Sequence, residues 1–417
     1  MSHSLSKNTV YNILRTSSPI LFQLAMFPYV ARVLEPAGVG RVAFAQSVVA
    51  YAALVASLGM EPFAVRACSQ VRGDRAALSL VASRLMSIGI FAAGAAYGLL
   101  ALALVFWDGL RGYESLVLVL SVSIAFTAVG CEWLNTAMED FRWIALRTLA
   151  VQMVSLVLVF ACVRGAGDTM VYAGILAVAA GGAGLANVWY RRRFCTVSFT
   201  TDIDARRDLL PVLTFFGILV AQTIYTNTDI TMLGVLCGDE EAGLYSTAVK
   251  VYNAVNRVVA SVSLVVLPQA AVAFAVGDYR KVARLLRYAL GVVAALGLPC
   301  AAGMYAFAPE ILWVVGGDAY VAAAPVLRTL VFAILLSYAG GVIGSVLFLA
   351  AGRERIGLIG GALSAFVNFA LNLYFIPRYG MMAAAWTTVA AEAVALAPLV
   401  CMWDRRVKLW RMDKTND

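Results

Sequence analysis

Long apolar runs, separated by short polar segments, follow one another along the whole 417-residue chain. A bilayer core about 30 Å thick needs roughly 20 mostly apolar residues per helix. Twelve runs reach that length, and they predict transmembrane helices over 9–33, 40–65, 78–106, 113–137, 143–163, 169–190, 209–236, 243–275, 283–308, 320–350, 356–376 and 381–403. The pattern therefore predicts an all-α, multi-pass membrane protein with about twelve transmembrane helices.

Composition agrees with that class and disfavours enzymes. The chain is 62% hydrophobic and 13% charged, with a mean hydropathy of +0.84, far from the usual makeup of a soluble domain. Its one histidine is His3, and we find no nucleophile motif, phosphate loop or metal-ligand cluster. We expect no enzymatic activity and no cofactor. The N-terminus lacks a cleavage pattern, so we expect the first span to be retained.

The distribution of positive charge predicts the orientation in the membrane. Lys and Arg collect on the cytoplasmic side of membrane proteins. With the N-terminus inside, the outer loops contain only Arg32, Arg41, Arg111, Arg164 and Arg378 of the 32 basic residues. We therefore expect both termini in the cytoplasm. The net charge of +8 reflects this topology, and the basic tail predicts contact with anionic membrane lipids rather than nucleic acid.

The second half of the chain repeats the first. The segment "EPAGVG" at 35–40 corresponds to "EEAGLY" at 240–245, and each half carries six predicted spans in the same order. An even number of spans gives both halves the same orientation, as in transporters whose repeats are related by an axis along the membrane normal. We predict an N-terminal lobe over 1–190, a cytoplasmic linker over 191–208, a C-terminal lobe over 209–403 and a cytoplasmic tail over 404–417.

Two segments near the N-terminus carry a resemblance to a known family: "NTVYNIL" and "FPYVARVLEPAGVGRVAFAQSVVAYAALVASLGMEPFAVRACSQVRGD". They are similar to the opening of the Wzx-type O-antigen flippases, polysaccharide biosynthesis membrane proteins of the multidrug/oligosaccharidyl-lipid/polysaccharide exporter superfamily. The family pattern has a glycine after "RVL", where this chain has Glu35 and Pro36. The resemblance implies a two-lobed bundle in the bacterial inner membrane. It would pass undecaprenyl-diphosphate-linked oligosaccharide to the outer leaflet.

A polar stripe along the predicted eighth span suits such a substrate. Its members recur at steps of four, three, four and four residues, which places them on one helical face: Ser246, Lys250, Asn253, Arg257 and Ser261. Even low estimates put the free-energy cost of a charged side chain at the bilayer centre at about 2.5 to 3.5 kcal/mol. We therefore expect this face to line a water-filled cleft and not to contact lipid. We expect Lys250, Asn253 and Arg257 to bind the diphosphate.

Three further arginines are candidates for substrate binding. Arg15 lies in the first span and Arg328 in the tenth, and both are also close enough to a span end to extend toward the membrane surface. Arg32 is at the outer edge of the first span, where an arginine costs little. Only the family's hairpin pattern makes Arg32 a candidate.

Oxygen-bearing side chains in the C-terminal half predict a site for the coupling ion. Asp229, Asn368, Asn372 and Thr388 fall at similar depths in three spans, and such ligands suit a hard cation such as sodium. The alternative is an ion pair between Asp229 and Lys250, without any bound ion. Glu392, in the middle of the last span, is either a partner of Arg257 or a carboxylate that couples transport to protons.

Other functions remain open from the sequence. Multidrug antiport of organic cations within the same superfamily would favour an acidic cleft, whereas this one is basic. A lipid II flippase usually has two further spans. A membrane polysaccharide polymerase would be expected to expose a long outer loop, which this chain lacks. We expect a monomer whose functional partners include a polysaccharide polymerase and a chain-length regulator.

Overall fold

The computed structural model describes residues 2–204 and 208–406, and within those ranges every element of regular structure is a helix. The predicted all-helical, multi-pass fold is confirmed. The chain forms two compact units, residues 1–223 and 224–417, and the division falls within α8 (Leu210–Leu236).

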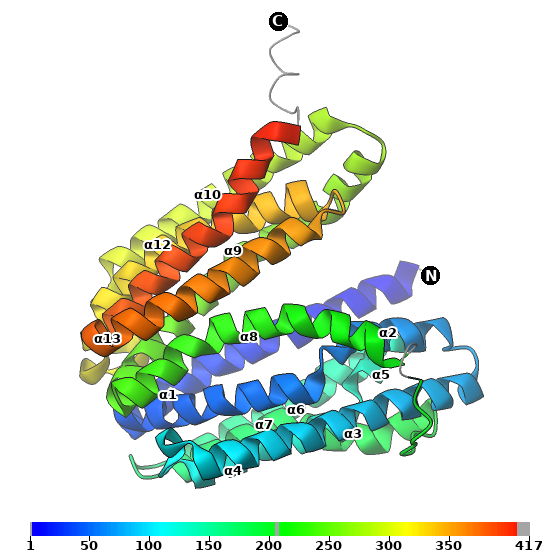
Figure 1. Cartoon of the computed structure of the whole chain (residues 1–417), viewed down its shortest axis with the longest axis horizontal. Coiled ribbons are helices and arrows are strands. Elements are labelled where there is room, and N and C mark those ends of the chain that lie inside the picture. The colour runs from blue at the N-terminus through cyan, green and yellow to red at the C-terminus, as the bar shows by residue number, and fades with distance from the viewer. Residues whose placement is uncertain (1, 205–207, 407–417) are drawn as a thin grey trace, which may run out of the picture. The chain divides into compact units, whose positions relative to one another are not determined.

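The first unit is built around its first helix. The elements are α1 (Ser2–Ser57), α2 (Met60–Gln70), α3 (Arg75–Phe106), η1 (Asp108–Leu110), α4 (Glu114–Gly130), α5 (Glu132–Ala137), α6 (Phe141–Cys162), α7 (Thr169–Tyr190) and η2 (Arg191–Arg193). Helix α1 packs against α3, α4 and α6, and α4 packs along α7 (Figure 1). These contacts form a bundle of long helices.

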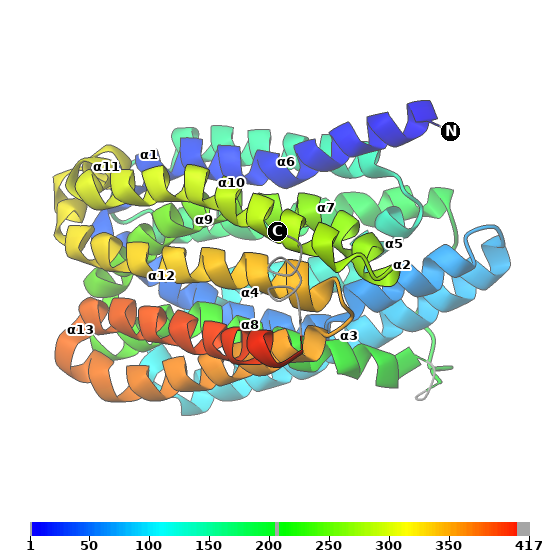
Figure 2. The ribbon, with the colours of Figure 1, turned by 90° about the horizontal axis from the view of Figure 1, so that it is seen from above.

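The second unit contains the end of α8 and the remaining helices. They are α9 (Asp239–Ala275), α10 (Tyr279–Ala306), α11 (Ala308–Gly316), η4 (Asp318–Ala323), α12 (Ala324–Ile343), the π-helical η5 (Gly344–Leu349) and α13 (Glu354–Arg406). Helix α12 packs against α9, α10 and α13. Figure 2 shows the two halves of α13, in orange and red, side by side.

Seven helical stretches of the described residues are long and apolar enough to cross a membrane. Two of these stretches contain helices joined at a residue with non-helical backbone: Leu21–Gln70 at Glu35 in α1, and Glu354–Met402 at Gly380 in α13. The stretch Leu21–Gln70 also includes α2. Shorter apolar helices occur at Glu114–Gly130 and Val265–Ala275. The joints at Glu35 and Gly380 coincide with the predicted breaks between spans.

Two predicted spans are interrupted. The span expected over 40–65 ends at Leu58 and Gly59, both with positive φ, and the span over 113–137 breaks at Cys131, with φ 50°. The break at Cys131 leaves carbonyl groups at the end of α4 without helical partners. Asn187 donates from Nδ2 to the carbonyl of Gly130 at 2.6 Å, and Arg191 donates to that of Val129. Side chains of α7 and η2 thus replace the missing helical hydrogen bonds.

Helices α4 and α7 approach closely beside this break. A Cβ added at Gly184 would overlap the backbone oxygen of Phe126, and one added at Gly130 would lie 2.7 Å from the Cα of Gly184. Small residues allow helix backbones to meet in this way in membrane proteins. The close approach brings Asn187, one turn further along α7, to the end of α4.

The segment after η2 is fixed to α3 by a ladder of hydrogen bonds. Alternate backbone N–H groups of the segment donate to serine hydroxyls spaced by four residues on α3: Thr196 to Ser79, Ser198 to Ser83 and Thr200 to Ser87, at 3.2, 3.0 and 2.8 Å. Arg84 then pairs with Asp202 at 2.6 Å. The first part of the predicted linker is therefore anchored to the first unit.

The backbone at Glu35 generates a stability prediction. Glu35 has φ 59° and ψ 172°, a region that residues other than glycine occupy at a cost of about 1–3 kcal/mol. This is also the position at which the sequence lacks the glycine expected from its family resemblance. We expect Glu35→Gly to raise the free energy of unfolding by about 1 kcal/mol, because strain relief exceeds the added entropy of the unfolded chain.

Thermal unfolding of the purified protein in detergent measures this effect. Glu35→Ala is the matched control, because it removes the same carboxylate but keeps the strained backbone. A Glu35→Gly variant that melts no higher than Glu35→Ala would contradict the strain argument.

Candidate functional site

A buried polar cluster lies within the second unit and includes all four predicted sodium ligands. Its centre is Asp229 on α8, whose carboxylate accepts hydrogen bonds from Tyr245 Oη at 2.5 Å, Asn372 Nδ2 at 2.5 Å and Thr388 Oγ1 at 3.0 Å. Asn372 Nδ2 also donates to Asn368 Oδ1 at 3.1 Å. Helices α8, α9 and α13 therefore meet at one carboxylate.

The cluster is closed from solvent and its amides are oriented. Asn368 and Asn372 are at most 1% exposed, and Thr387 donates its hydroxyl to Asn372 Oδ1. Asn372 thus presents its nitrogen, not its oxygen, to Asp229. Asn368 Nδ2 has no hydrogen-bond partner among the described residues.

Asp229 has no cationic partner in the described part of the chain. Its hydrogen bonds come from a tyrosine, an amide and a threonine, and Lys250 is not among its contacts. The alternative of an Asp229–Lys250 ion pair is therefore wrong in this structure. The reason is helical geometry: Tyr245 faces Asp229, and Lys250, five residues later, points about 140° away around the same helix.

A second carboxylate lies one turn from the first. Glu392 on α13 accepts a hydrogen bond from Tyr225 Oη at 2.7 Å, and Tyr225 is one turn before Asp229 on α8. Of the two alternatives for Glu392, the pairing with Arg257 is not found among the described contacts. Each carboxylate is instead bound by a tyrosine.

The predicted stripe on α9 passes from the interior of the second unit to its surface. Ser246 is buried and donates to the carbonyl of Gly243, Lys250 is partly buried, and Asn253 and Arg257 are exposed. The side chain of Ser261 lies outside the described residues. The described members thus share one helical face, which becomes more accessible with distance from the polar cluster.

The three other candidate arginines occupy different surroundings. Arg328 donates from Nε to the carbonyl of Tyr305 at 3.1 Å, and its guanidinium lies 5.8 Å from the centre of the Tyr305 ring. Arg32 is exposed on α1. The side chain of Arg15 lies outside the described residues. Arg328 is thus held by α10 and not by the polar cluster.

Sequence reasoning missed two members of the cluster, Tyr245 and Thr387. Tyr245 directly precedes Ser246 on α9, and its hydroxyl donates to the carboxylate of Asp229. The duplicated "EEAGLY" segment, which ends at Tyr245, was the available signal. Thr387 lies at almost the same depth as Thr388 but is not among the predicted ligands, and it contacts Asn372 rather than Asp229.

Two models of known protein families match the chain, and together they cover most of it. The family model described as "Polysaccharide biosynthesis protein" matches residues 5–274. The family model described as "Lipid II flippase MurJ" matches residues 242–416. No curated protein matches the chain.

Solved structures agree on the fold. An inward-facing multidrug resistance transporter of the MATE family superposes with a TM-score of 0.70 at 16% identity, over 97% of this chain and 99% of that one. The lipid II flippase MurJ in an inward closed conformation gives 0.65 at 16% identity, over 87% and 85%. An outward-facing MATE transporter gives 0.55 at 16% identity, over 99% and 96%.

The family model covers well over half of the chain, and the structural likenesses extend over nearly all of it. The chain therefore belongs to the family of polysaccharide biosynthesis proteins, and it shares its fold with a multidrug transporter and a lipid II flippase.

Proposed function

We propose that this protein moves undecaprenyl-diphosphate-linked oligosaccharide from the cytoplasmic to the outer leaflet of the bacterial inner membrane by alternating access. The observation that carries the proposal is the pair Lys250 and Arg257 on one face of α9, inside the stretch matched by the polysaccharide biosynthesis family. A mid-span arginine with an exposed side chain is too costly to face lipid. It belongs in a water-filled cleft, where it binds an anion.

The sign of these charges favours a lipid-linked diphosphate over a drug. An arginine and a lysine on one face suit phosphate oxygens, which accept charge-assisted hydrogen bonds from both. Organic cations would be repelled by the same face. The likeness to multidrug transporters, at 16% identity, supports the fold and not this alternative.

Lipid II is the second candidate substrate, because the lipid II flippase model matches residues 242–416. That stretch includes Lys250, Arg257 and most of the polar cluster. Lipid II also carries a diphosphate, so the α9 cations do not separate the two substrates. Vesicles loaded with each lipid in turn would separate them.

The polar cluster is our proposed coupling site. A buried carboxylate without a cationic partner needs a proton or a metal cation to balance its charge. Asp229, Asn368 and Thr388 direct oxygen atoms toward a common region, and one negative charge suits a monovalent ion such as sodium. Asn372 would join as a ligand only after its amide rotates, since its nitrogen faces Asp229. Glu392 is the alternative coupling residue, with protons in place of sodium.

The phosphate proposal predicts that Arg257→Ala abolishes surface polysaccharide while the protein reaches the membrane in normal amount. The loss of a charge-assisted hydrogen bond should lower kcat/KM for flipping roughly 10- to 100-fold, with Lys250→Ala giving a similar defect. Arg257→Lys should remain impaired, because the planar fork is lost. Surface polysaccharide is measured by gel electrophoresis, and flipping in vesicles with lipid-linked oligosaccharide from the native host.

Arg378→Ala is the matched control, since Arg378 is exposed and stacks over Tyr374, 4.0 Å from the ring centre. Normal polysaccharide in both Arg257→Ala and Lys250→Ala cells would refute the phosphate role.

The coupling proposal predicts that a sodium gradient drives flipping in reconstituted vesicles. Asp229→Asn and Asn368→Ala should abolish the response to sodium, because each removes a proposed ligand. Glu392→Gln should retain it. Unmutated protein that flips at the same rate with and without a sodium gradient would exclude the sodium site, and a response to pH lost in Glu392→Gln would assign coupling to protons.

A further inference from the structure

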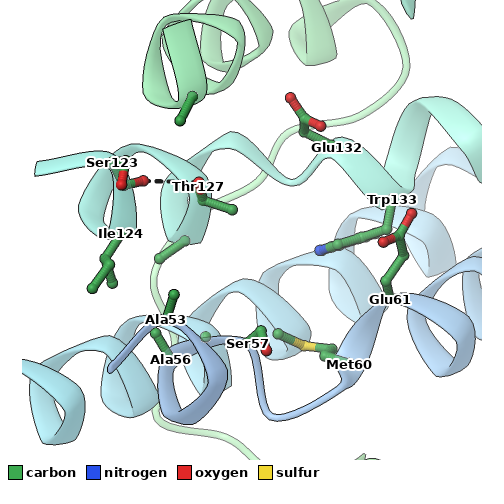
Figure 3. Close-up of a pocket in the computed structure, with 13 residues that line it drawn as sticks. Ala53, Ala56, Ser57, Met60, Glu61, Ser123, Ile124, Thr127, Glu132 and Trp133 are labelled. Carbon is green, nitrogen blue, oxygen red and sulfur yellow. Dashed lines mark hydrogen bonds between the residues drawn. The ribbon is translucent and has the colours of Figure 1, made fainter. Parts of the chain in front are cut away.

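A cavity of about 370 Å³ lies within the first unit, and its lining includes none of the residues proposed to bind phosphate or the coupling ion. It is lined by residues of α1, α2, α3, α4, α5 and α7, beside the break between α4 and α5 (Figure 3). Its walls are mostly apolar, with Ala53, Ala56 and Ile124 among them, and its polar groups include Ser57 and Thr127. The volume is at the lower end of the roughly 300–1,000 Å³ of small-molecule sites.

Trp133 directs a hydrogen-bond donor into this cavity. The residue is 8% exposed, and Figure 3 shows its indole nitrogen pointing into the space between the lining residues of α1 and those of α4. Within the described part of the chain, this N–H has no hydrogen-bond acceptor. By contrast, Trp143 in the same unit donates to Asn187 at 3.4 Å. The N–H of Trp133 is therefore open to the cavity, where it can donate to an acceptor on a bound molecule.

The charged groups on the cavity wall are carboxylates. Glu61 and Glu132 both line it, whereas its described lining includes no lysine or arginine. Arg147, whose side chain is 3% exposed, holds Glu132 at 2.8 Å and donates to the carbonyl of Ala183 at 2.9 Å. Its charge is thus directed to Glu132 rather than to a ligand. The cavity therefore does not suit a phosphate group.

A ligand of this cavity has to offer both kinds of hydrogen-bonding group. It can accept a hydrogen bond from Trp133 and donate one to a carboxylate oxygen of Glu132 or Glu61, while an apolar face contacts the alanine and isoleucine walls. A sugar ring meets all three conditions, because each hydroxyl both donates and accepts and the ring carries C–H faces. An organic cation satisfies the carboxylates but leaves the Trp133 N–H without an acceptor.

We propose that this cavity is a sugar-binding subsite that takes a hydroxyl-bearing monosaccharide unit. That the sugar is part of the transported lipid rests on the proposed function, but the binding itself does not. The lining residues of α2 and α5 come from the ends of predicted spans that the charge distribution places toward the cytoplasm. A flippase meets its substrate on that side of the membrane.

Free monosaccharides test the proposal directly. Full-length purified protein in detergent is titrated with a neutral hexose, an N-acetylhexosamine and a 6-deoxyhexose, and binding is followed by saturation-transfer NMR. At least one sugar should bind saturably. Trp133→Phe, which keeps the ring and removes the N–H, should weaken that binding roughly two- to tenfold, and Glu61→Gln roughly tenfold or more.

Trp189→Phe is the matched control, because Trp189 is 72% exposed on α7 and does not line the cavity. It should bind the sugar as the unmutated protein does. Absence of saturable binding by all three sugars, or equal binding by Trp133→Phe and Trp189→Phe, would overturn the proposal. Tetraphenylphosphonium that binds and depends on Glu61, without sugar binding, would assign the cavity to organic cations instead.

The vesicle assay separates this inference from the proposed function. Sugar binding that depends on Trp133, in a protein that does not flip lipid-linked oligosaccharide, would support the subsite and reject the proposed function. Flipping that is normal in Trp133→Phe, with no sugar bound at the cavity, would reject the subsite and leave the function in place.

Discussion

Every polar backbone group within the bilayer has to be satisfied by the protein itself, and this constraint organises the molecule. Continuous helices meet it without help from side chains. Wherever a helix breaks, side chains must take over, as Asn187 and Arg191 do for the carbonyl groups at the end of α4. Polar residues in an apolar chain of this kind are therefore concentrated at breaks and at sites. The cavity beside the α4–α5 break and the Asp229 cluster follow the same rule.

The constraint also explains which parts of the fold were predictable. Apolar length alone gives the positions of the long helices, since hydrophobic thickness fixes the number of residues per span. It does not give the breaks inside a span: Gly59 and Gly130 stand beside them, but glycines are frequent within the spans of this chain, and the positive φ at Leu58 and Cys131 falls on apolar residues. The compensating hydrogen bonds come from α7, more than fifty residues further along the chain. A local reading of the sequence does not detect such distant compensation.

In the candidate site, too, some features were predictable from the sequence and others were not. Asp229, Asn372 and Thr388 were grouped by depth and helical spacing, and they do meet through hydrogen bonds. Depth alone also suggested an ion pair between Asp229 and Lys250. Contact depends in addition on the direction in which each side chain leaves the helix, and it is Tyr245 that points toward the Asp229 carboxylate. Side-chain direction depends on how α9 packs against its neighbours, which a single sequence does not specify. Depth was therefore predictable, whereas the choice of partner was not.

The position of Tyr245 links the two proposed sites of the second unit. Tyr245 binds Asp229, and it is on the same helix as Lys250 and Arg257. A sodium ion or proton on Asp229 would compete with the Tyr245 hydroxyl for the same oxygens, so its binding changes the contact between α8 and α9. Binding free energies are reciprocal: if the ion alters how α9 holds a phosphate, a phosphate on α9 alters ion affinity by the same factor. If the protein has the proposed function, this hydrogen bond would be the physical route by which an ion gradient drives the movement of an anionic lipid.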